Sequence, residues 1–265
     1  MSKNKNLHGF HIVDPSPWPI FASFTALLLT TGTVAYMHGY IHGIFSIKLA
    51  LILLLLISFL WWRDIIREAT FEGHHTSLVQ TNIKYGMILF IITEIMFFIS
   101  FFWAFFHFSF NPSIFIGGVW PPVFLNILNP WSIPLLNTII LLSSGATITL
   151  AHHAIILGSK DLSVIALITT ISLAIIFTLL QAEEYISAPF SIYTTAYGSS
   201  FFMLTGFHGF HVIIGTIFIS VCLIRLFFDH FTQEHHLGFE TAAWYWHFVD
   251  VVWLFLFLSV YWWGS

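Results

Sequence analysis

Residues 84–107, KYGMILFIITEIMFFISFFWAFFH, form an apolar run with a single charge in its interior, Glu94. Because an α-helix rises ~1.5 Å per residue, a run of this length crosses the ~30 Å hydrocarbon core of a bilayer. Along such a helix Glu94 lies ~15 Å from Lys84, near the bilayer midplane. The stretch therefore predicts a transmembrane helix with one carboxyl group at its centre.

The position of Glu94 raises the question of function, because an ionisable group at that depth is costly and indicates a functional role by default. Residues one helical turn away, among them Phe90, Ile91 and Phe98, are apolar and offer no countercharge. Two interpretations stand. Glu94 is either a proton-linked or gating group, or a carboxyl group that only holds helices together by hydrogen bonds.

The composition is that of an integral membrane protein. Of 265 residues, 58% are hydrophobic and 8% are charged, whereas soluble domains have about 25% charged residues. Eight Lys and Arg residues do not provide the basic face of a nucleic-acid-binding protein, so nucleic acid is excluded as a partner. The single cysteine, Cys222, excludes a disulfide framework and a thiolate metal cluster. The N-terminus shows no cleavable targeting pattern, so the first spanning helix is expected to direct insertion.

Seven apolar segments are long enough to span a bilayer. They are Pro17–Tyr36, Ile44–Trp62, Lys84–His107, Leu135–His153, Leu162–Glu184, Tyr197–Phe228 and Phe239–Trp262. An N-terminus on the inner side leaves only Lys48 near the outer face and satisfies the positive-inside rule. The inner basic residues are then Lys3, Lys5, Arg63, Arg67, Lys84, Lys160 and Arg225. The expected fold class is an all-α membrane protein of seven transmembrane helices, with the C-terminus outside.

The polar connection between Trp61 and Lys84 divides this single membrane domain, residues 1–265. We expect a two-helix unit over residues 16–66 and a five-helix unit over residues 80–265. A split bundle leaves a cleft that lipid fills, with phosphate headgroups near the basic and histidine side chains of the connection. These side chains are Arg63, Arg67, His74 and His75, and the alternative is that they are ordinary interfacial anchors.

Many of the 15 histidines fall on the predicted inner side and can exchange protons near neutral pH. The candidate proton-exchange patch consists of His8, His11, His235 and His236. Alternatively, these residues are ordinary interfacial hydrogen-bonding groups. Adjacent residues on a helix point ~100° apart, so a HisHis pair does not chelate one metal ion, and no metal site is predicted.

Two polar pairs lie inside predicted helices, His208 with His211 and His247 with Asp250, each three residues apart on one helix face. We expect hydrogen bonds within these pairs and to neighbouring helices; haem ligation by His208 or His211 is the alternative. Small residues are expected to allow close helix approach at Gly206, Gly209 and Ser143–Thr147.

Specific runs are distributed along essentially the whole chain: PSPWP (15–19), WWRDIIREATFEGHHT (61–76), YGMILFIITE (85–94), FFWAFFH (101–107), PLLNT (134–138), TGFHGFHVIIG (205–215) and WYWHFVDVVWLFLFLSVYWWGS (244–265). In these runs the sequence resembles subunit III of mitochondrial-type cytochrome c oxidase, a haem-copper oxidase family. The resemblance implies a non-catalytic core subunit of a terminal respiratory oxidase that reduces O2 to water and pumps protons. It also implies a V-shaped, lipid-filled cleft between the two-helix and five-helix units.

The resemblance further implies that this chain binds no redox centre, with haem and copper in partner subunits I and II. Other implied partners are accessory subunits, a respiratory supercomplex and structural phospholipids that include cardiolipin. The implied location is the mitochondrial inner membrane, as a multi-pass protein of the respiratory chain. The implied tasks are to stabilise subunit I, to bind lipids and to assist proton uptake.

Carried over by position, Glu94 matches the family's membrane carboxylate, and no residue matches a catalytic group. The implied lipid contacts are Arg67, Glu68 and His75 at one headgroup, Trp103 and His107 at a second, and Arg225 and His230 at cardiolipin. The chain departs from the family at Phe228, where a further basic residue is expected, and in outer loops that lack the expected acidic residues. The alternatives are a quinol oxidase subunit III, a free-standing ion transporter and a haem-binding membrane enzyme.

Overall fold

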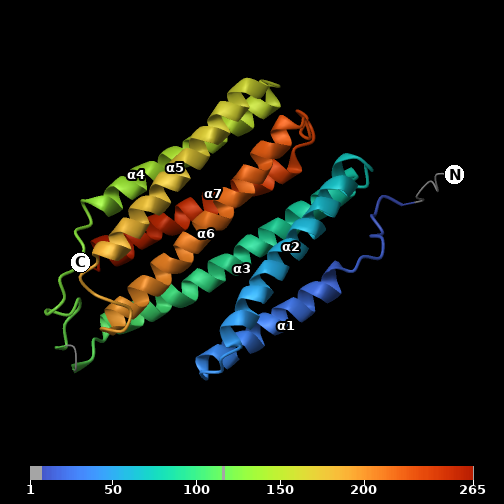
Figure 1. The fold of residues 1–265 in the computed structure, drawn as a ribbon. Helices are drawn as coiled ribbons and strands as arrows, with labels where there is room; N and C mark the ends of the chain where they lie inside the picture. The colour runs from blue at the N-terminus through green and yellow to red at the C-terminus, as the bar shows by residue number, and fades with distance from the viewer. Residues whose placement is uncertain (1–7, 115–116, 265) are drawn as a thin grey trace. The chain divides into compact units, whose positions relative to one another are not determined.

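The computed structural model describes residues 8–114 and 117–264, so Lys3 and Lys5 lie outside the described residues. Within them every regular element is helical, and seven helices are long and apolar enough to cross a membrane (Figure 1), which confirms the predicted all-α fold of seven spanning helices. The helices are α1 (Trp18–Met37), α2 (Gly43–Thr70), α3 (Ser77–Phe110), α4 (Ile133–Ile156), α5 (Lys160–Ser187), α6 (Ala196–Phe227) and α7 (Leu237–Leu256). A π-helical turn, η2 (Phe257–Trp262), continues α7.

The polar connection after Trp62 is more helical than predicted. Helix α2 continues to Thr70, because no Gly or Pro interrupts the sequence until Gly73, which adopts a positive φ of 69°. Helix α3 begins at Ser77, well before Lys84. The connection is therefore a short turn between two helices that are longer than a bilayer requires.

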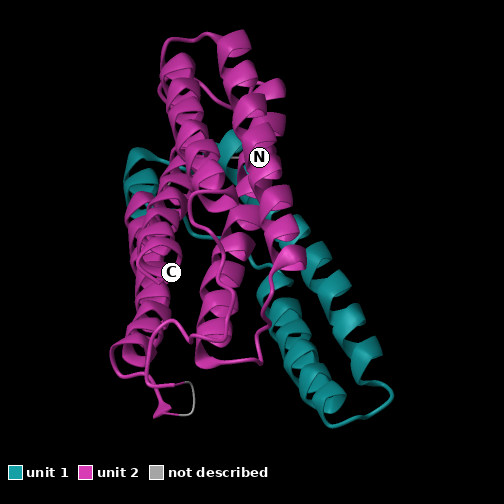
Figure 2. Ribbon diagram, turned by 90° about the vertical axis from the view of Figure 1, so that its left-hand side faces the viewer, with its two compact units in different colours: residues 1–83 teal, residues 84–265 magenta. Residues whose placement is uncertain are grey.

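The chain divides into two compact units, residues 1–83 and 84–265, coloured teal and magenta in Figure 2. In the first unit, α1 and α2 form a helical hairpin whose backbones approach closely at two glycines. A Cβ atom on Gly32 would lie 2.9 Å from Ser46 Cβ, and one on Gly43 would collide with the backbone of Tyr36. Toward the other end of the hairpin, Trp18 Nε1 donates a hydrogen bond to Asp64 Oδ2 at 2.7 Å.

In the second unit, α4, α5, α6 and α7 pack in sequence around one core, with α7 also packing against α4. Helix α7 contributes the largest buried side chains, Trp246 and Trp253. Trp246 Nε1 donates to Ser144 Oγ at 2.9 Å, and Trp253 Nε1 donates to Thr138 Oγ1 at 3.0 Å. These bonds satisfy the indole groups inside the membrane and fix the register of α7 against α4.

Gly215 on α6 provides the room for Trp246, because a Cβ atom there would lie 2.9 Å from the indole ring. The prediction of close approach at Gly209 is wrong, since nothing lies within 4 Å of a Cβ atom built at that position. The two glycines are six residues apart, about 240° around the helix, so they lie on different faces of α6. At Gly206 a Cβ atom would meet only the Tyr185 hydroxyl, at 3.7 Å.

Helix α3 is held to α6 and α7 by large side chains. The ring of Phe97 packs edge-on against Phe207 at 4.9 Å, and the ring of Phe98 lies 6.0 Å from Phe248. Phe102 makes a similar contact with Phe255 at 6.4 Å. A ladder of aromatic side chains thus spaces α3 from its neighbours and leaves room between them for a long polar side chain.

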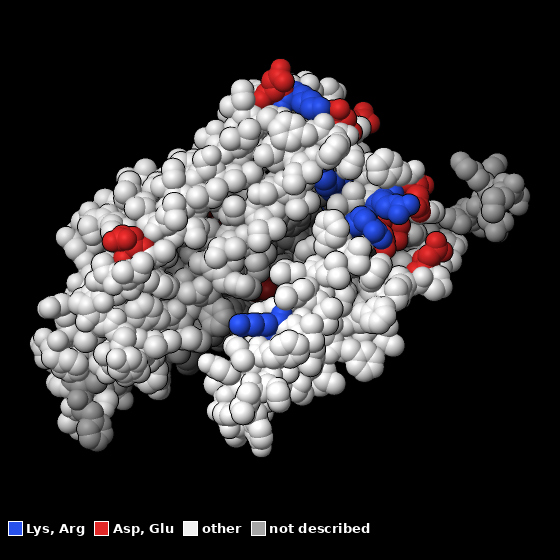
Figure 3. Space-filling model, in the orientation of Figure 1, with Lys and Arg blue, Asp and Glu red and all other residues white. Residues whose placement is uncertain are grey.

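Charged side chains are few on the surface. Figure 3 shows a face that is mostly uncharged, with Lys, Arg, Asp and Glu gathered in small groups. Lys and Arg side chains pair with carboxylates toward the helix ends, as in Arg63–Asp64 at 2.8 Å, Lys84–Glu240 at 2.6 Å and Lys160–Asp229 at 2.6 Å. The long helical walls between these ends are suited to lipid and to other membrane proteins.

We expect Gly215→Ala to destabilise the second unit by about 1–3 kcal/mol, because the added methyl group overpacks the contact with Trp246. The matched control, Gly209→Ala, adds the same methyl group to open space, so it is expected to be neutral or stabilising by up to about 1 kcal/mol. Heating the assembled protein in detergent and measuring loss of native structure compares the two. Equal midpoints for both variants would contradict this packing.

Candidate functional site

The candidate site is formed where α3 and α6 face each other at mid-length. The Glu94 carboxyl group meets the His211 ring across this contact, with Oε2 and Nε2 2.8 Å apart. The Glu94 side chain is 23% exposed and that of His211 is 8% exposed. Helix α6 thus supplies the polar partner that α3 itself lacks.

The hydrogen bonds of His211 determine where its protons lie. Its Nδ1 is 2.7 Å from the carbonyl oxygen of Phe207, which can only accept, so Nδ1 carries a hydrogen and donates it. The remaining nitrogen, Nε2, faces Glu94 Oε2, and one proton lies between them. Either a neutral carboxylic acid donates to a neutral ring, or a charged ring donates to a carboxylate.

Aromatic rings surround this pair. The ring of Phe98 lies 5.0 Å from that of His211, and the rings of Tyr245 and Phe248 lie 6.3 and 6.2 Å away. Such surroundings have a low dielectric constant, which strengthens the hydrogen bond and makes an unpaired polar group costly. The arrangement can hold a proton and move it between two atoms.

The expected bond between His208 and His211 is wrong. His208 Nε2 donates instead to the backbone oxygen of Val249 on α7, at 3.2 Å, and His208 is 1% exposed. Residues three apart differ by about 60° in direction around a helix, enough for His208 to reach α7 while His211 reaches α3. Both ring nitrogens of His211 are engaged, which disfavours it as a haem ligand.

The second predicted pair lies between α7 and α4. His247 Nδ1 is 3.7 Å from Asp250 Oδ2, and its Nε2 is 3.4 Å from Thr149 Oγ1. Asp250 is buried, and a Cβ atom on Gly145 would collide with its carboxyl group. Gly145, within the predicted small-residue run, therefore makes room for a polar side chain from α7.

A buried carboxyl group that sequence reasoning missed is Glu184 on α5. It is 2% exposed, and Tyr261 Oη donates to its Oε1 at 2.6 Å. Gln181, one turn earlier on α5, lies 3.4 Å from the same hydroxyl. A polar spacing of three residues at the end of an apolar run, Gln181 and Glu184, was the available signal.

The predicted headgroup residues of the first unit lie around the end of α2. Arg63 is paired with Asp64, whereas Arg67 is exposed and forms no ion pair within the described residues. Glu68 and His75 are half-buried nearby in sequence, before and after the turn at Gly73. Of the two arginines, Arg67 is the one that has no carboxylate within ion-pair distance among the described residues.

The other predicted lipid contacts lie in the second unit. Trp103, which is 75% exposed, and His107 point outward from α3. The guanidinium carbon of Arg225 lies 4.5 Å from the centre of the Phe231 ring. Burial and the charge of Arg225 lower the pKa of His230.

The four histidines of the predicted proton-exchange patch divide between the units. His8 is exposed, and His11 stacks on His74 with ring centres 4.8 Å apart, both in the first unit. His235 and His236 belong to the second unit, where His236 is 5% exposed. Burial removes His236 from a solvated patch, because its ring, at the N-cap position of α7, packs against His152.

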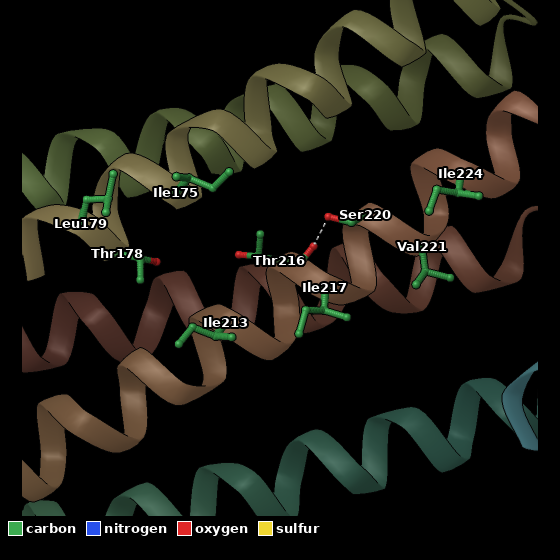
Figure 4. A pocket seen from close by; sticks show the side chains of 9 residues that line it. All are labelled: Ile175, Thr178, Leu179, Ile213, Thr216, Ile217, Ser220, Val221 and Ile224. Carbon is green, nitrogen blue, oxygen red and sulfur yellow. Dashed lines mark hydrogen bonds between the residues drawn. The ribbon is translucent and has the colours of Figure 1, made fainter. Parts of the chain in front are cut away.

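An apolar groove of about 470 Å³ runs between α5 and α6 (Figure 4). Its polar lining is limited to three hydroxyl groups, and all three donate to backbone oxygens of their own helix. Ser220 donates to the oxygen of Thr216, and Thr216 donates to that of Val212. The third, Thr178, donates to Ala174 in the same way. The groove therefore suits a hydrocarbon chain and offers no chemistry.

The chain resembles known proteins along its whole length. The family model described as Cytochrome c oxidase subunit III matches residues 8–265. The chain is 60% identical over 258 residues to cytochrome c oxidase subunit 3 of Prototheca wickerhamii, which covers 97% of this chain and 98% of that relative. It is 59% identical over 258 residues to the same subunit of Arabidopsis thaliana, covering 97% of each. For Chondrus crispus the identity is 58% over 265 residues, covering 100% of this chain and 97% of the relative.

Proposed function

The chain belongs to the cytochrome c oxidase subunit III family, and we propose that its Glu94–His211 pair holds and releases a proton inside the membrane. As a member it is a membrane-embedded subunit of the terminal respiratory oxidase, a respiratory oxidoreductase, and it works in a complex with other oxidase subunits. We also propose that haem and copper are bound by partner subunits I and II. Accessory subunits and a respiratory supercomplex are further proposed partners, and the proposed location is the mitochondrial inner membrane.

The observation that carries the proposal is the 2.8 Å contact between Glu94 Oε2 and His211 Nε2. Because the Phe207 oxygen holds the hydrogen on Nδ1, a proton that the pair releases is the one between Nε2 and Oε2. In a low-dielectric site, the balance between the neutral and the ionic pair responds strongly to nearby charge. A charge change in a neighbouring subunit during turnover would thereby shift the proton.

We propose a lipid-binding role for the exposed cations of the helix ends. Arg67 extends from the last turn of α2 without an ion-pair partner among the described residues, and an exposed Phe71 follows it. This combination suits a phosphate headgroup with its acyl chains beside the apolar walls of α1 and α2. Arg63, Glu68 and His75 complete the headgroup surroundings. Trp103 and His107 form a second lipid contact, and Arg225 with His230 form a third, for cardiolipin.

We propose that His8 and His11 assist proton uptake. Both precede α1, and the exposed ring of His8 and the stacked rings of His11 and His74 offer titratable nitrogens near neutral pH. His235, half-buried at the start of α7, offers another in the second unit.

Glu94→Gln separates a proton role from helix packing. The Gln amide can still donate to His211 Nε2, so we expect normal assembly but impaired proton pumping or faster inactivation during turnover. Glu94→Leu removes the hydrogen bond as well, and a buried unsatisfied nitrogen is expected to cost about 1–3 kcal/mol of stability. Purified oxidase in vesicles gives both readouts, with Thr93→Val as the control. If Glu94→Gln pumps and survives like the wild type, the carboxyl group only holds the helices together.

Arg67→Gln should release a phospholipid from the purified oxidase. A basic residue near the headgroups contributes about 1 kcal/mol to lipid binding, so affinity is expected to fall about fivefold. Arg63→Gln is the matched control one turn earlier, and its effect is expected to be smaller because Asp64 already neutralises that charge. Mass spectrometry of bound phospholipids tests this. Equal retention in wild type and Arg67→Gln would contradict the assignment.

Replacing His8 and His11 together by Asn is expected to slow proton uptake, most strongly at high pH where protons are scarce. The control is His42→Asn, a histidine on the predicted outer side. Oxidase turnover measured against pH gives the comparison. A profile that coincides with that of the wild type would show that these histidines do not supply protons.

A further inference from the structure

Three metal-binding side chains meet where α4 ends and α7 begins. His152 lies in the last turns of α4, His236 caps the start of α7, and Glu240 lies in its first turn. One ligand atom from each lies within 4.8 Å of the others. All three belong to the second unit, away from the Glu94 site at mid-membrane.

The ring of His236 is oriented as a metal ligand would be. Its Nδ1 donates to the backbone oxygen of Thr232 at 3.0 Å, which leaves a lone pair on Nε2. That Nε2 faces His152 Nε2 at 3.2 Å and Glu240 Oε1 at 3.6 Å. A backbone acceptor behind an imidazole is the usual outer-shell support of a metal-binding histidine.

The distance between the two histidine nitrogens matches the tetrahedral coordination of a metal ion. With metal–nitrogen bonds of about 2.0–2.1 Å, two ligand nitrogens lie about 3.3 Å apart. The observed 3.2 Å between the two Nε2 atoms agrees with this separation. Two histidines with one carboxylate form a three-ligand zinc set that leaves a fourth position for water.

We propose that His152, His236 and Glu240 bind one Zn²⁺ ion that fastens the end of α4 to the start of α7. The ion replaces the hydrogen bond between the two histidines with two metal–nitrogen bonds. The C-terminal end of the α4 dipole and the Glu240 carboxylate favour the positive ion, and the carboxylate offsets the partial positive charge at the start of α7. The half-exposed His152 gives the ion access from the surface.

Lys84 is expected to lower the zinc affinity of this site. Its Nζ lies 2.6 Å from Glu240 Oε2, so it occupies one carboxylate oxygen and leaves Oε1 for the metal. The ammonium group orients the carboxylate but also repels a second cation. Removing this charge is therefore expected to tighten zinc binding.

The sequence did not predict the site because each HisHis pair was considered alone. One histidine comes from each of two pairs, His152 from residues 152–153 and His236 from residues 235–236. The rule that adjacent histidines do not chelate together still holds. Only the fold brings the two pairs together, and the Glu240 carboxylate at i+4 from His236 completes the set.

Equilibrium dialysis of the purified oxidase against a Zn²⁺ series, followed by metal analysis, tests the proposal. Wild type is expected to hold one zinc ion more than His236→Gln, His152→Gln or Glu240→Gln. Losing a ligand should weaken the site by at least about 100-fold, since outer-shell changes alone cost 10–100-fold. The matched control, His153→Gln, alters the exposed neighbour of His152 and is expected to keep the ion. Lys84→Met is expected to bind zinc several-fold more tightly.

Zinc sites elsewhere in the oxidase cancel in these differences. Haem content and the amount of this subunit in the purified oxidase identify any variant that fails to assemble. If the histidine variants fail, zinc binding is compared between the wild type, Glu240→Gln and Lys84→Met. X-ray absorption of the bound ion is expected to show two imidazoles in its first shell. The proposal is overturned if the assembled ligand variants bind zinc with the stoichiometry and affinity of the wild type.

Discussion

Hydrocarbon supplies no hydrogen-bond partner, so each polar side chain between the helix ends needs one from its own or a neighbouring helix. Hydroxyl groups bond to a backbone oxygen of their own helix, as Thr170 does by donating to the oxygen of Ala166. Larger groups reach across to a neighbouring helix, and the Glu94–His211 bond joins two titratable side chains at mid-length of α3 and α6. Helix α3, spaced from α6 and α7 by phenylalanine rings, has this bond as its central polar attachment.

The rest of the second unit is arranged so that this contact can form. Trp246 and Trp253 fix α7 against α4, and Gly215 lets α6 approach α7 over the Trp246 ring. His208 ties α6 to the backbone of α7, so the face that carries His211 is held toward α3. Near the start of α7, the Lys84–Glu240 pair is a second polar attachment of α3, this time to α7.

Much of this was accessible from the sequence. Long apolar runs predict transmembrane helices because their length must match the bilayer, and the lone Glu94 in such a run identified the site. Its partner was not identified, because the sequence shows which helix face His211 occupies but not which helix faces it. The sequence did offer one clue to the partner: Glu94 and His211 both lie midway along their predicted helices and therefore at a similar depth in the membrane. The prediction at Gly209 failed for a related reason. A small residue indicates close helix approach only if another helix packs against the face that carries it.

The central claim is that Glu94 and His211 share one proton, and infrared difference spectroscopy of the assembled oxidase measures this directly. The Glu94 carboxyl band is identified by its loss in Glu94→Gln. If the proton is shared, that band should shift in His211→Leu, where the carboxyl group loses its partner. A Glu94 band at the same frequency with and without the His211 ring would contradict the claim.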